Sequence, residues 1–190
     1  MNSIARYITT LPAFLTAVVI HEYAHGWIAY KLGDNTAKDS GRLTLNPLSH
    51  IDPIGTVVLP LFLILTRSPI VFGWAKPVPV NIYNLRNPKR DMIWVGLAGP
   101  LANFLGVFIF YNFFRLQIFP EFSAAAYFLE TAVVINLILG IFNLIPMPPL
   151  DGSKIVIGLL PRRLAYNYSR IEPYGVVILI LLLLLLQSIF

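Results

Sequence analysis

The chain has 190 residues, of which 57% are hydrophobic and only 12% are charged. This composition excludes an ordinary soluble globule, and several apolar runs approach the roughly 18 residues that a bilayer core requires. The absence of cysteine excludes disulfides and thiolate metal sites. The net charge of +5 could suit nucleic acid, but the basic residues flank apolar segments, which is typical of membrane proteins. We therefore expect one integral membrane domain over residues 1–190, with the lipid bilayer and not nucleic acid as its partner.

The first apolar run, Ile4 to Tyr30, is long enough to cross a bilayer as a helix, and it lacks the small-residue cleavage site of a signal peptide. A second stretch, Ile54 to Thr66, has about 13 residues, which favours a re-entrant or interfacial helix over a crossing. The segment from Trp74 to Asn81 alternates in the way a short strand does. Pro77 and Pro79 would confine that strand to a sheet edge.

Two further spans are predicted, from about Met92 to Phe114 and from Ser123 to about Leu144. Asn87-Pro88 is typical of an N-cap followed by a proline in the first turn of the earlier helix. The final run, Tyr174 to Phe190, is nearly all leucine and isoleucine, so we expect a C-terminal membrane anchor helix over residues 173–190. The expected fold class is all-α: a polytopic helical bundle of about four crossings plus one re-entrant or interfacial helix, with short β-strands near the cytoplasmic face.

The basic residues predict the orientation of the chain. Eight of them lie between Lys31 and Arg90, and four more lie between Lys154 and Arg170. If Ile54–Thr66 does not cross, both basic segments lie on one side of the membrane, which the positive-inside rule makes the cytoplasm. This topology places both termini outside, in what we expect to be a bacterial inner membrane.

The sequence HEYAH, at residues 21–25 of the first span, carries the most specific chemistry. Residues four apart share one face of a helix, so His21 and His25 can bind one metal ion, with Glu22 as a general base beside it. This is the zinc-hydrolase pattern, in which the ion lowers the pKa of its bound water. The alternative is that hydrogen bonds within the bundle satisfy both histidines and that Glu22 pairs with a cation, which is costly inside a membrane.

Asp151 is the candidate for a third ligand. It follows an apolar span and a proline-rich break, and in the four-crossing topology it reaches the membrane surface near His25. Two histidines, one carboxylate and an open position for water make a catalytic zinc site. Alternatively, Asp151-Gly152 is a turn pair at a helix end. His50 lies in a loop, and we interpret it as a turn or interfacial residue and not as a ligand.

Three separated motifs resemble the site-2 protease family of intramembrane metalloproteases. They are HEYAH, GPLAN at residues 99–103, and NLIPMPPLDG at residues 143–152, which matches the family pattern N-x-x-P-x-P-x-L-D-G at every fixed position. The resemblance covers a core of about residues 8–160. The segments GRLTLNPLSHIDPIGT and FGWAKPVPVN are similar to those of the small bacterial branch. The connection from Arg115 to Phe122 is too short for a PDZ module, and we expect no regulatory domain after the last span.

The resemblance implies that His21, His25 and Asp151 bind one Zn²⁺ per chain and that Glu22 is the catalytic base. It also implies that the substrate backbone is held at the end of a neighbouring span.

Three residues near the expected centre are assigned through the same resemblance. Asn143 would bind the substrate backbone, and Gly99 to Asn103 would pack beside the site. Both asparagines have an alternative role as polar contacts between helices. The segment Trp74–Asn81 could bind an unwound substrate by strand addition, or its prolines could protect a sheet edge from unwanted pairing.

The expected function is therefore that of an intramembrane zinc endopeptidase. It would hydrolyse peptide bonds in or near transmembrane segments of membrane proteins, with its active site near the cytoplasmic face. The competing interpretation is a non-proteolytic metal-binding scaffold or a metal transporter that uses the same ligands. A scaffold has no need of Glu22 as a base, and a transporter would carry polar residues across the span, where residues 8–20 offer only threonines.

Overall fold

The computed structural model describes residues 3–66, 73–120, 123–179 and 181–182, and these are mostly helical. The long helices are α1 (Ser3–Lys31), α4 (Pro88–Arg115) and α5 (Ala124–Asn143). The short α-helices are α2 (Thr36–Asp39), α3 (Leu59–Leu65), α6 (Asp151–Leu159) and α7 (Arg162–Ser169). Single turns and a π-helix complete the described elements: η1 (Pro47–His50), η2 (Pro53–Val58), η3 (Ile82–Asn84) and η4 (Glu172–Tyr174).

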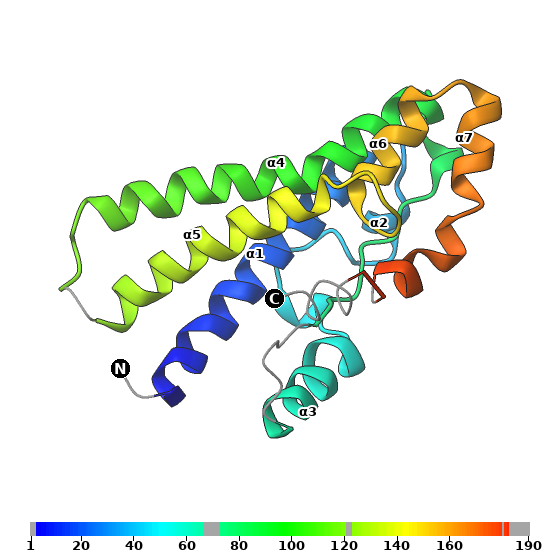
Figure 1. The fold of residues 1–190 in the computed structure, drawn as a ribbon. Helices are drawn as coiled ribbons and strands as arrows, with labels where there is room; N and C mark the ends of the chain where they lie inside the picture. Colours follow the sequence, from blue (N-terminus) through cyan, green and yellow to red (C-terminus); the bar gives the residue numbers. More distant parts are fainter. Residues whose placement is uncertain (1–2, 67–72, 121–122, 180, 183–190) are drawn as a thin grey trace.

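The three long helices pack against one another and form the body of the protein. α4 and α5 run side by side as a hairpin, α1 packs against both of them, and α6 packs against α4 (Figure 1). The helices α2, α6 and α7 lie toward one end of this bundle, and the α4–α5 connection lies at the other end. The sequence motifs that carry the candidate metal ligands therefore lie toward the end of the bundle where the short helices are.

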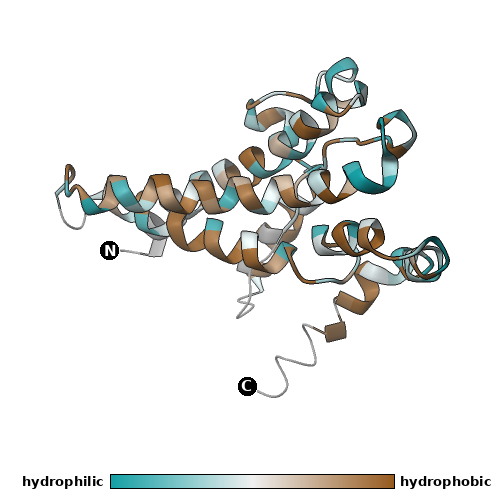
Figure 2. Cartoon of the chain, turned by 90° about the horizontal axis from the view of Figure 1, so that it is seen from above, coloured by the Kyte–Doolittle hydropathy of each residue, from teal (hydrophilic) through white to brown (hydrophobic). Residues whose placement is uncertain are grey.

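Among the described residues, α4 and α5 are long and apolar enough to cross a membrane. Their lengths of 28 and 20 residues correspond to about 42 and 30 Å of helix rise, against a hydrocarbon core of about 30 Å. Figure 2 shows hydrophobic residues along the long helices and hydrophilic ones gathered at the short helices and loops. The described residues thus contain two candidate spans, and the four expected crossings are not confirmed.

The starts of these two helices follow from local sequence. Pro88 occupies the first turn of α4, as predicted, but the side chain of Asn87 makes no cap hydrogen bond. The Asp91 carboxylate accepts a hydrogen bond of 2.8 Å from the Asn87 N–H instead, which satisfies a donor just outside the helix. At the start of α5, the Ser123 hydroxyl accepts a hydrogen bond of 3.2 Å from the Ala126 N–H.

The strand predicted at Trp74–Asn81 is not formed, and the described part of the chain contains no β-strand. The backbone N–H groups of this segment donate to other parts of the chain and not to a neighbouring strand. The Trp74 N–H donates to the Gly55 carbonyl, and the Lys76 N–H donates to the His50 carbonyl. Because Pro77 and Pro79 have no N–H, regular pairing along this segment is broken.

The apolar stretch predicted at Ile54–Thr66 is helical and short, as η2 followed by α3. Asp52 caps it by accepting hydrogen bonds from the Ile54 and Gly55 N–H groups at 3.0 and 2.7 Å. α3 stands apart from the α1–α4–α5 bundle (Figure 1), and exposed apolar side chains such as Leu61 and Phe62 extend from it. Half of the anchor helix predicted at 173–190 lies outside the described residues. In the described half, residues 175–179 and 181–182 are helical.

Candidate metal centre

Three potential ligand atoms from α1 and α6 converge at the bundle end. The Nε2 atoms of His21 and His25 lie 3.0 Å from each other, and each lies 3.0 Å from Oδ2 of Asp151. The three residues are only 4–5% exposed. The donors of a tetrahedral Zn²⁺ with bonds of about 2.0–2.1 Å are expected to lie about 3.3 Å apart, close to this triangle. The donor set and its spacing therefore fit zinc.

The other nitrogen of each ring is held by a hydrogen-bond acceptor. The Nδ1 of His25 lies 2.6 Å from the Val95 carbonyl oxygen, and the Nδ1 of His21 lies 2.6 Å from Oδ1 of Asn103. Both acceptors belong to α4. Because a carbonyl oxygen can only accept, each ring carries its hydrogen on Nδ1, and the Nε2 lone pairs point toward Asp151. This is the tautomer that a metal-binding histidine needs.

The loop between α5 and α6 places Asp151 opposite the histidines. Asp151 is the first residue of α6, and Gly152 allows that helix to approach the preceding loop closely. A Cβ on Gly152 would lie 2.3 Å from the Ile145 carbonyl oxygen. The Lys154 ammonium donates a 2.8 Å hydrogen bond to Oδ1 of Asp151, so the other oxygen, Oδ2, is the one that faces His21 and His25. Asp151 therefore lies beside His25, as the sequence predicts, and its role as a metal ligand stays a prediction.

Gly99 of α4 lies directly against the histidine pair. A Cβ at this position would lie 2.5 Å from Nε2 of His25 and 2.6 Å from Nε2 of His21, closer than real Cβ contacts. The absence of a side chain at Gly99 therefore leaves the space in which the two Nε2 atoms converge. A metal ion and its ligands need such a hollow, and any larger residue would fill it.

Glu22 has a backbone partner that the sequence did not reveal. Its Oε2 accepts a hydrogen bond of 2.8 Å from the Val78 N–H, in the extended segment Trp74–Asn81. The side chain of Val78 is buried against Gly26, one helical turn along α1 from Glu22. The segment that was predicted as a strand is thus fixed to α1 beside the His-His-Asp cluster.

Two polar anchors outside the long helices hold the same segment in place. The Arg42 guanidinium donates to the carbonyl oxygens of Lys76 and Pro77 at 2.8 and 3.2 Å. The buried Asp34 carboxylate accepts a 2.7 Å hydrogen bond from the Asn81 N–H and further bonds from Thr36 and Asn84. Burial acts to raise the pKa of Asp34, but the hydrogen bonds, chiefly those from Thr36, outweigh it and hold this pKa below its usual value.

Among the other residues considered from the sequence, Asn103 is the one that contacts the cluster through a described hydrogen bond. Asn103 is fully buried behind His21, with 0% of its surface exposed. Asn143 ends α5, and its amide donates a 3.0 Å hydrogen bond to the Leu139 carbonyl of its own helix. His50 is buried in the turn η1 and donates to the Thr44 carbonyl at 2.8 Å, in keeping with a turn residue. It does not belong to the His-His-Asp group found among the described residues.

Sequence reasoning missed three groups around the cluster. The Val95 carbonyl accepts from His25, the Val78 N–H donates to Glu22, and the side chain of Asn136 accepts from Asn103. The two backbone groups carry no sequence signal, because every residue other than proline has the same N–H and C=O groups. Asn136 could have been noticed. It is a polar residue in the middle of an apolar span, and such residues are costly and often functional.

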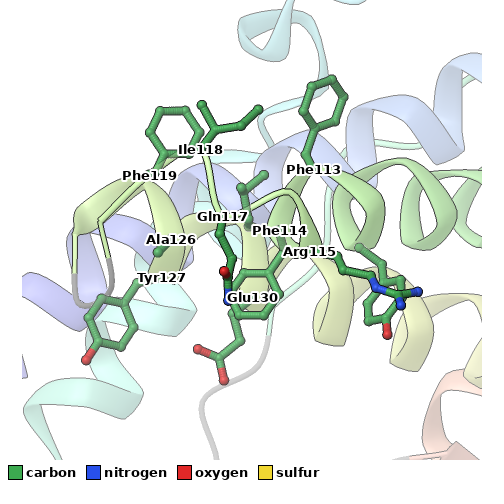
Figure 3. A pocket seen from close by; sticks show the side chains of 11 residues that line it. Phe113, Phe114, Arg115, Gln117, Ile118, Phe119, Ala126, Tyr127 and Glu130 are labelled. Carbon is green, nitrogen blue, oxygen red and sulfur yellow. The ribbon is translucent and has the colours of Figure 1, made fainter.

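A separate pocket of about 370 Å³ lies at the far end of the hairpin, where α4 meets α5 (Figure 3). Aromatic residues such as Phe114 and Tyr127 line it, together with the charged residues Arg115 and Glu130. None of the predicted site residues lines this pocket. The pocket is therefore distinct from the His-His-Asp cluster.

The helical membrane fold and the buried His-His-Asp cluster define the class of a membrane metallohydrolase. A model of "Peptidase family M50" matches residues 118–186. YwhC of Bacillus subtilis (strain 168), whose name describes a zinc metalloprotease, is 38% identical over 175 residues, covering 88% of this chain and 76% of YwhC. The chain therefore belongs to peptidase family M50, the site-2 protease family, and is a zinc metalloprotease with Zn²⁺ as its cofactor.

More distant relatives carry similar names. Rip2 of Mycolicibacterium smegmatis, also named as a zinc metalloprotease, is 27% identical over 187 residues, which cover 97% of this chain and 70% of Rip2. The zinc metalloprotease MJ0392 of Methanocaldococcus jannaschii is 26% identical over 174 residues, which cover 89% of this chain and 39% of MJ0392. No solved structure gives a significant match to the chain.

Proposed function

We propose that this zinc metalloprotease is an intramembrane endopeptidase, which hydrolyses peptide bonds in or near transmembrane segments of other membrane proteins. The observation that carries the proposal is the position of the His-His-Asp cluster, buried between α1, α6 and the apolar hairpin of α4 and α5. A site enclosed by spanning helices is reached most directly by a substrate that is itself in the bilayer. The family and the named relatives support the proteolytic chemistry.

In this proposal His21, His25 and Asp151 hold the zinc ion. When bound, Zn²⁺ acts as a Lewis acid, polarising a carbonyl and lowering the pKa of a coordinated water. The residues' own part is to present three donors from rigid elements, with His21 and His25 fixed by their Nδ1 hydrogen bonds. Asn103 thereby acts behind His21 and not on the substrate, because its side chain has no exposed surface.

Glu22 is the general base in the proposed reaction. It would take a proton from the water whose oxygen attacks the peptide carbonyl carbon, and it would return this proton to the amine nitrogen as the C–N bond breaks. The Val78 N–H holds one oxygen of this carboxylate in place. Asn143, at the adjacent end of α5, is the proposed donor to the substrate backbone, and Gly99 leaves the space beside the ligands.

The site is proposed to lie near the cytoplasmic face of a bacterial inner membrane. His25 lies six residues before the end of α1 at Lys31, or about 9 Å of helix rise from the surface. The orientation also requires that η2 and α3 do not cross. Together they run from Pro53 to Leu65, about 20 Å of helix at 1.5 Å per residue, which is short of the roughly 30 Å core.

The test uses the full chain reconstituted with a reporter protein that has one transmembrane segment. Glu22→Gln should keep its zinc but lose cleavage by at least about 100-fold, since general-base catalysis contributes about 10²–10⁴. Asp151→Ala serves as the matched control for metal loss, because it should lose zinc and cleavage together. Cleavage by Glu22→Gln at the wild-type rate would contradict the proposed base. Cleavage only of soluble peptides would contradict the proposed substrate class, and metal binding without any proteolysis would favour a scaffold or transporter.

A further inference from the structure

We propose that Asn136, in the middle of α5, is a positioning residue for the metal centre. Together with the Ala17 carbonyl, it fixes the amide orientation of Asn103, and that orientation favours one tautomer of His21. This inference rests on the proposed role of His21 as a metal ligand. Asn136 contacts neither the ion's donors nor the space for substrate, so its effect passes through Asn103.

The two asparagines form a buried chain of hydrogen bonds between three helices. Nδ2 of Asn103 donates to Oδ1 of Asn136 at 2.9 Å and to the Ala17 carbonyl at 3.1 Å. Nδ2 of Asn136 donates to the Ala132 carbonyl of its own helix at 2.8 Å. Both asparagine side chains are 0% exposed, so water does not compete for these groups.

Only one orientation of the two asparagine amides is consistent with all of these hydrogen bonds. The Ala132 and Ala17 carbonyls can only accept, so each amide must turn its NH₂ group toward them. If Asn103 were reversed, its oxygen would face two further oxygens, Oδ1 of Asn136 and the Ala17 carbonyl. Buried polar groups left without a partner are costly, so this reversed orientation is disfavoured.

The consequence reaches the metal ligand. With its oxygen toward His21, Asn103 accepts the Nδ1 hydrogen at 2.6 Å. The hydrogen of neutral His21 is then on Nδ1, and the Nε2 lone pair is directed toward the ion. Asn136 and the Ala17 carbonyl therefore act together, from α5 and α1, to favour the tautomer of His21 that can bind a metal ion.

Packing around Asn136 is consistent with a site built to hold that side chain. Gly106 of α4 faces it, and a Cβ there would lie 2.7 Å from Oδ1 of Asn136. A simple polar contact between α4 and α5 would add slightly to helix packing and would leave zinc affinity unchanged. The two roles are thus separable by measuring zinc affinity and helix packing in the same variants.

The experiment uses purified full-length protein and measures zinc affinity by competition with a chelator. The Co²⁺-substituted protein gives an absorption spectrum that reports ligand geometry directly. Asn136→Leu should weaken zinc binding about tenfold and alter the Co²⁺ spectrum, as loss of outer hydrogen bonds does in other metal sites. Asn136→Asp keeps an oxygen that can accept from Asn103, and it should restore most of the affinity.

The matched control is Asn112→Leu. Asn112 is also an asparagine in a spanning helix, but its side chain is exposed and donates only to the Phe108 carbonyl of α4. This variant should leave zinc affinity and the Co²⁺ spectrum unchanged. Gly106→Ala perturbs Asn136 without removing it, so it should also weaken zinc binding and provides a second test if Asn136→Leu does not fold.

Folded Asn136→Leu or Gly106→Ala protein with wild-type zinc affinity and a wild-type Co²⁺ spectrum would overturn the inference. An equal loss in Asn112→Leu would overturn it as well, since any polar residue in a span would then have the same effect. His21→Ala separates this failure from failure of the metal site itself. If His21→Ala still binds zinc as the wild type does, the proposed ligand set is wrong; if it loses zinc while the Asn136 variants do not, only the positioning role is wrong.

Discussion

Gly99→Ala gives the sharpest test of the metal-centre geometry, because it adds one methyl group between the two histidines. In an ordinary helix this change would be favourable by about 1 kcal/mol, since alanine has the higher helix propensity. Here the new Cβ would lie 2.5 Å from Nε2 of His25, whereas ordinary van der Waals contact begins at 3.4 Å. Either the ring or α4 must therefore move by about 0.9 Å.

A movement of that size is incompatible with zinc coordination. Metal–ligand distances are held to within about 0.2 Å, so displacing His25 by several times that amount removes it as a ligand. Overpacking of this kind costs about 1–3 kcal/mol, which corresponds to a fall in zinc affinity of about 5- to 150-fold if all of it opposes metal binding. We expect cleavage of a reporter substrate to fall in parallel.

The assay is zinc affinity by chelator competition on purified Gly99→Ala, with thermal unfolding as a check on the fold. Gly140→Ala is the matched control in α5, because its Cβ would meet only the edge of the Phe104 ring, at 3.0 Å. That control should bind zinc as the wild type does. Wild-type zinc affinity in Gly99→Ala would refute the idea that this glycine makes room for the converging Nε2 atoms.

Two further predictions concern the segment Trp74–Asn81. Val78→Pro removes the N–H that donates to Glu22. Because hydrogen bonds to charged groups are worth about 1.5–3 kcal/mol, this variant should lower kcat by about tenfold or more, with zinc content unchanged. Val78→Ala keeps the N–H, and an equal loss of kcat in both variants would contradict this explanation. Asp34 has a lowered pKa, so its stabilising effect should be complete above the unfolded value of about 3.9 and be lost as pH falls through the lower folded value. Asp34→Asn should therefore unfold at lower temperature near neutral pH and show a flatter loss of stability below about pH 4, whereas parallel pH curves for mutant and wild type would count against it.

The helices were predictable because they depend on composition and local signals. The boundaries of α5 follow from Ser123 at its start and the proline-rich loop at its end, and both are visible in the sequence. The strand at Trp74–Asn81 was predicted wrongly for a physical reason. Alternating side chains indicate an extended backbone, but whether that backbone pairs with another strand depends on distant partners such as Arg42 and Glu22.

The candidate site was predictable as a set of residue types but not as an arrangement. Spacing alone brings His21 and His25 to one face, and the resemblance adds Asp151. Spacing does not show that Gly99 leaves the hollow or that Asn136 stands behind the ligands, because both depend on how α4 and α5 pack. Long-range packing is the step at which the sequence pattern stops being informative.

The same packing favours the metal-ligand interpretation of the histidines over the one in which hydrogen bonds alone satisfy them. If hydrogen bonds alone satisfied them, each close pair of atoms would share one hydrogen. The Nδ1 hydrogens of His21 and His25 are already donated away from the centre, to Asn103 and to the Val95 carbonyl. Two bare Nε2 atoms and a carboxylate oxygen of Asp151 are then left facing one another at 3.0 Å. Three acceptors repel at that distance unless a proton or a cation lies between them. A divalent cation supplies this charge for all three atoms at once, and it leaves each neutral ring in the tautomer that its α4 acceptor favours.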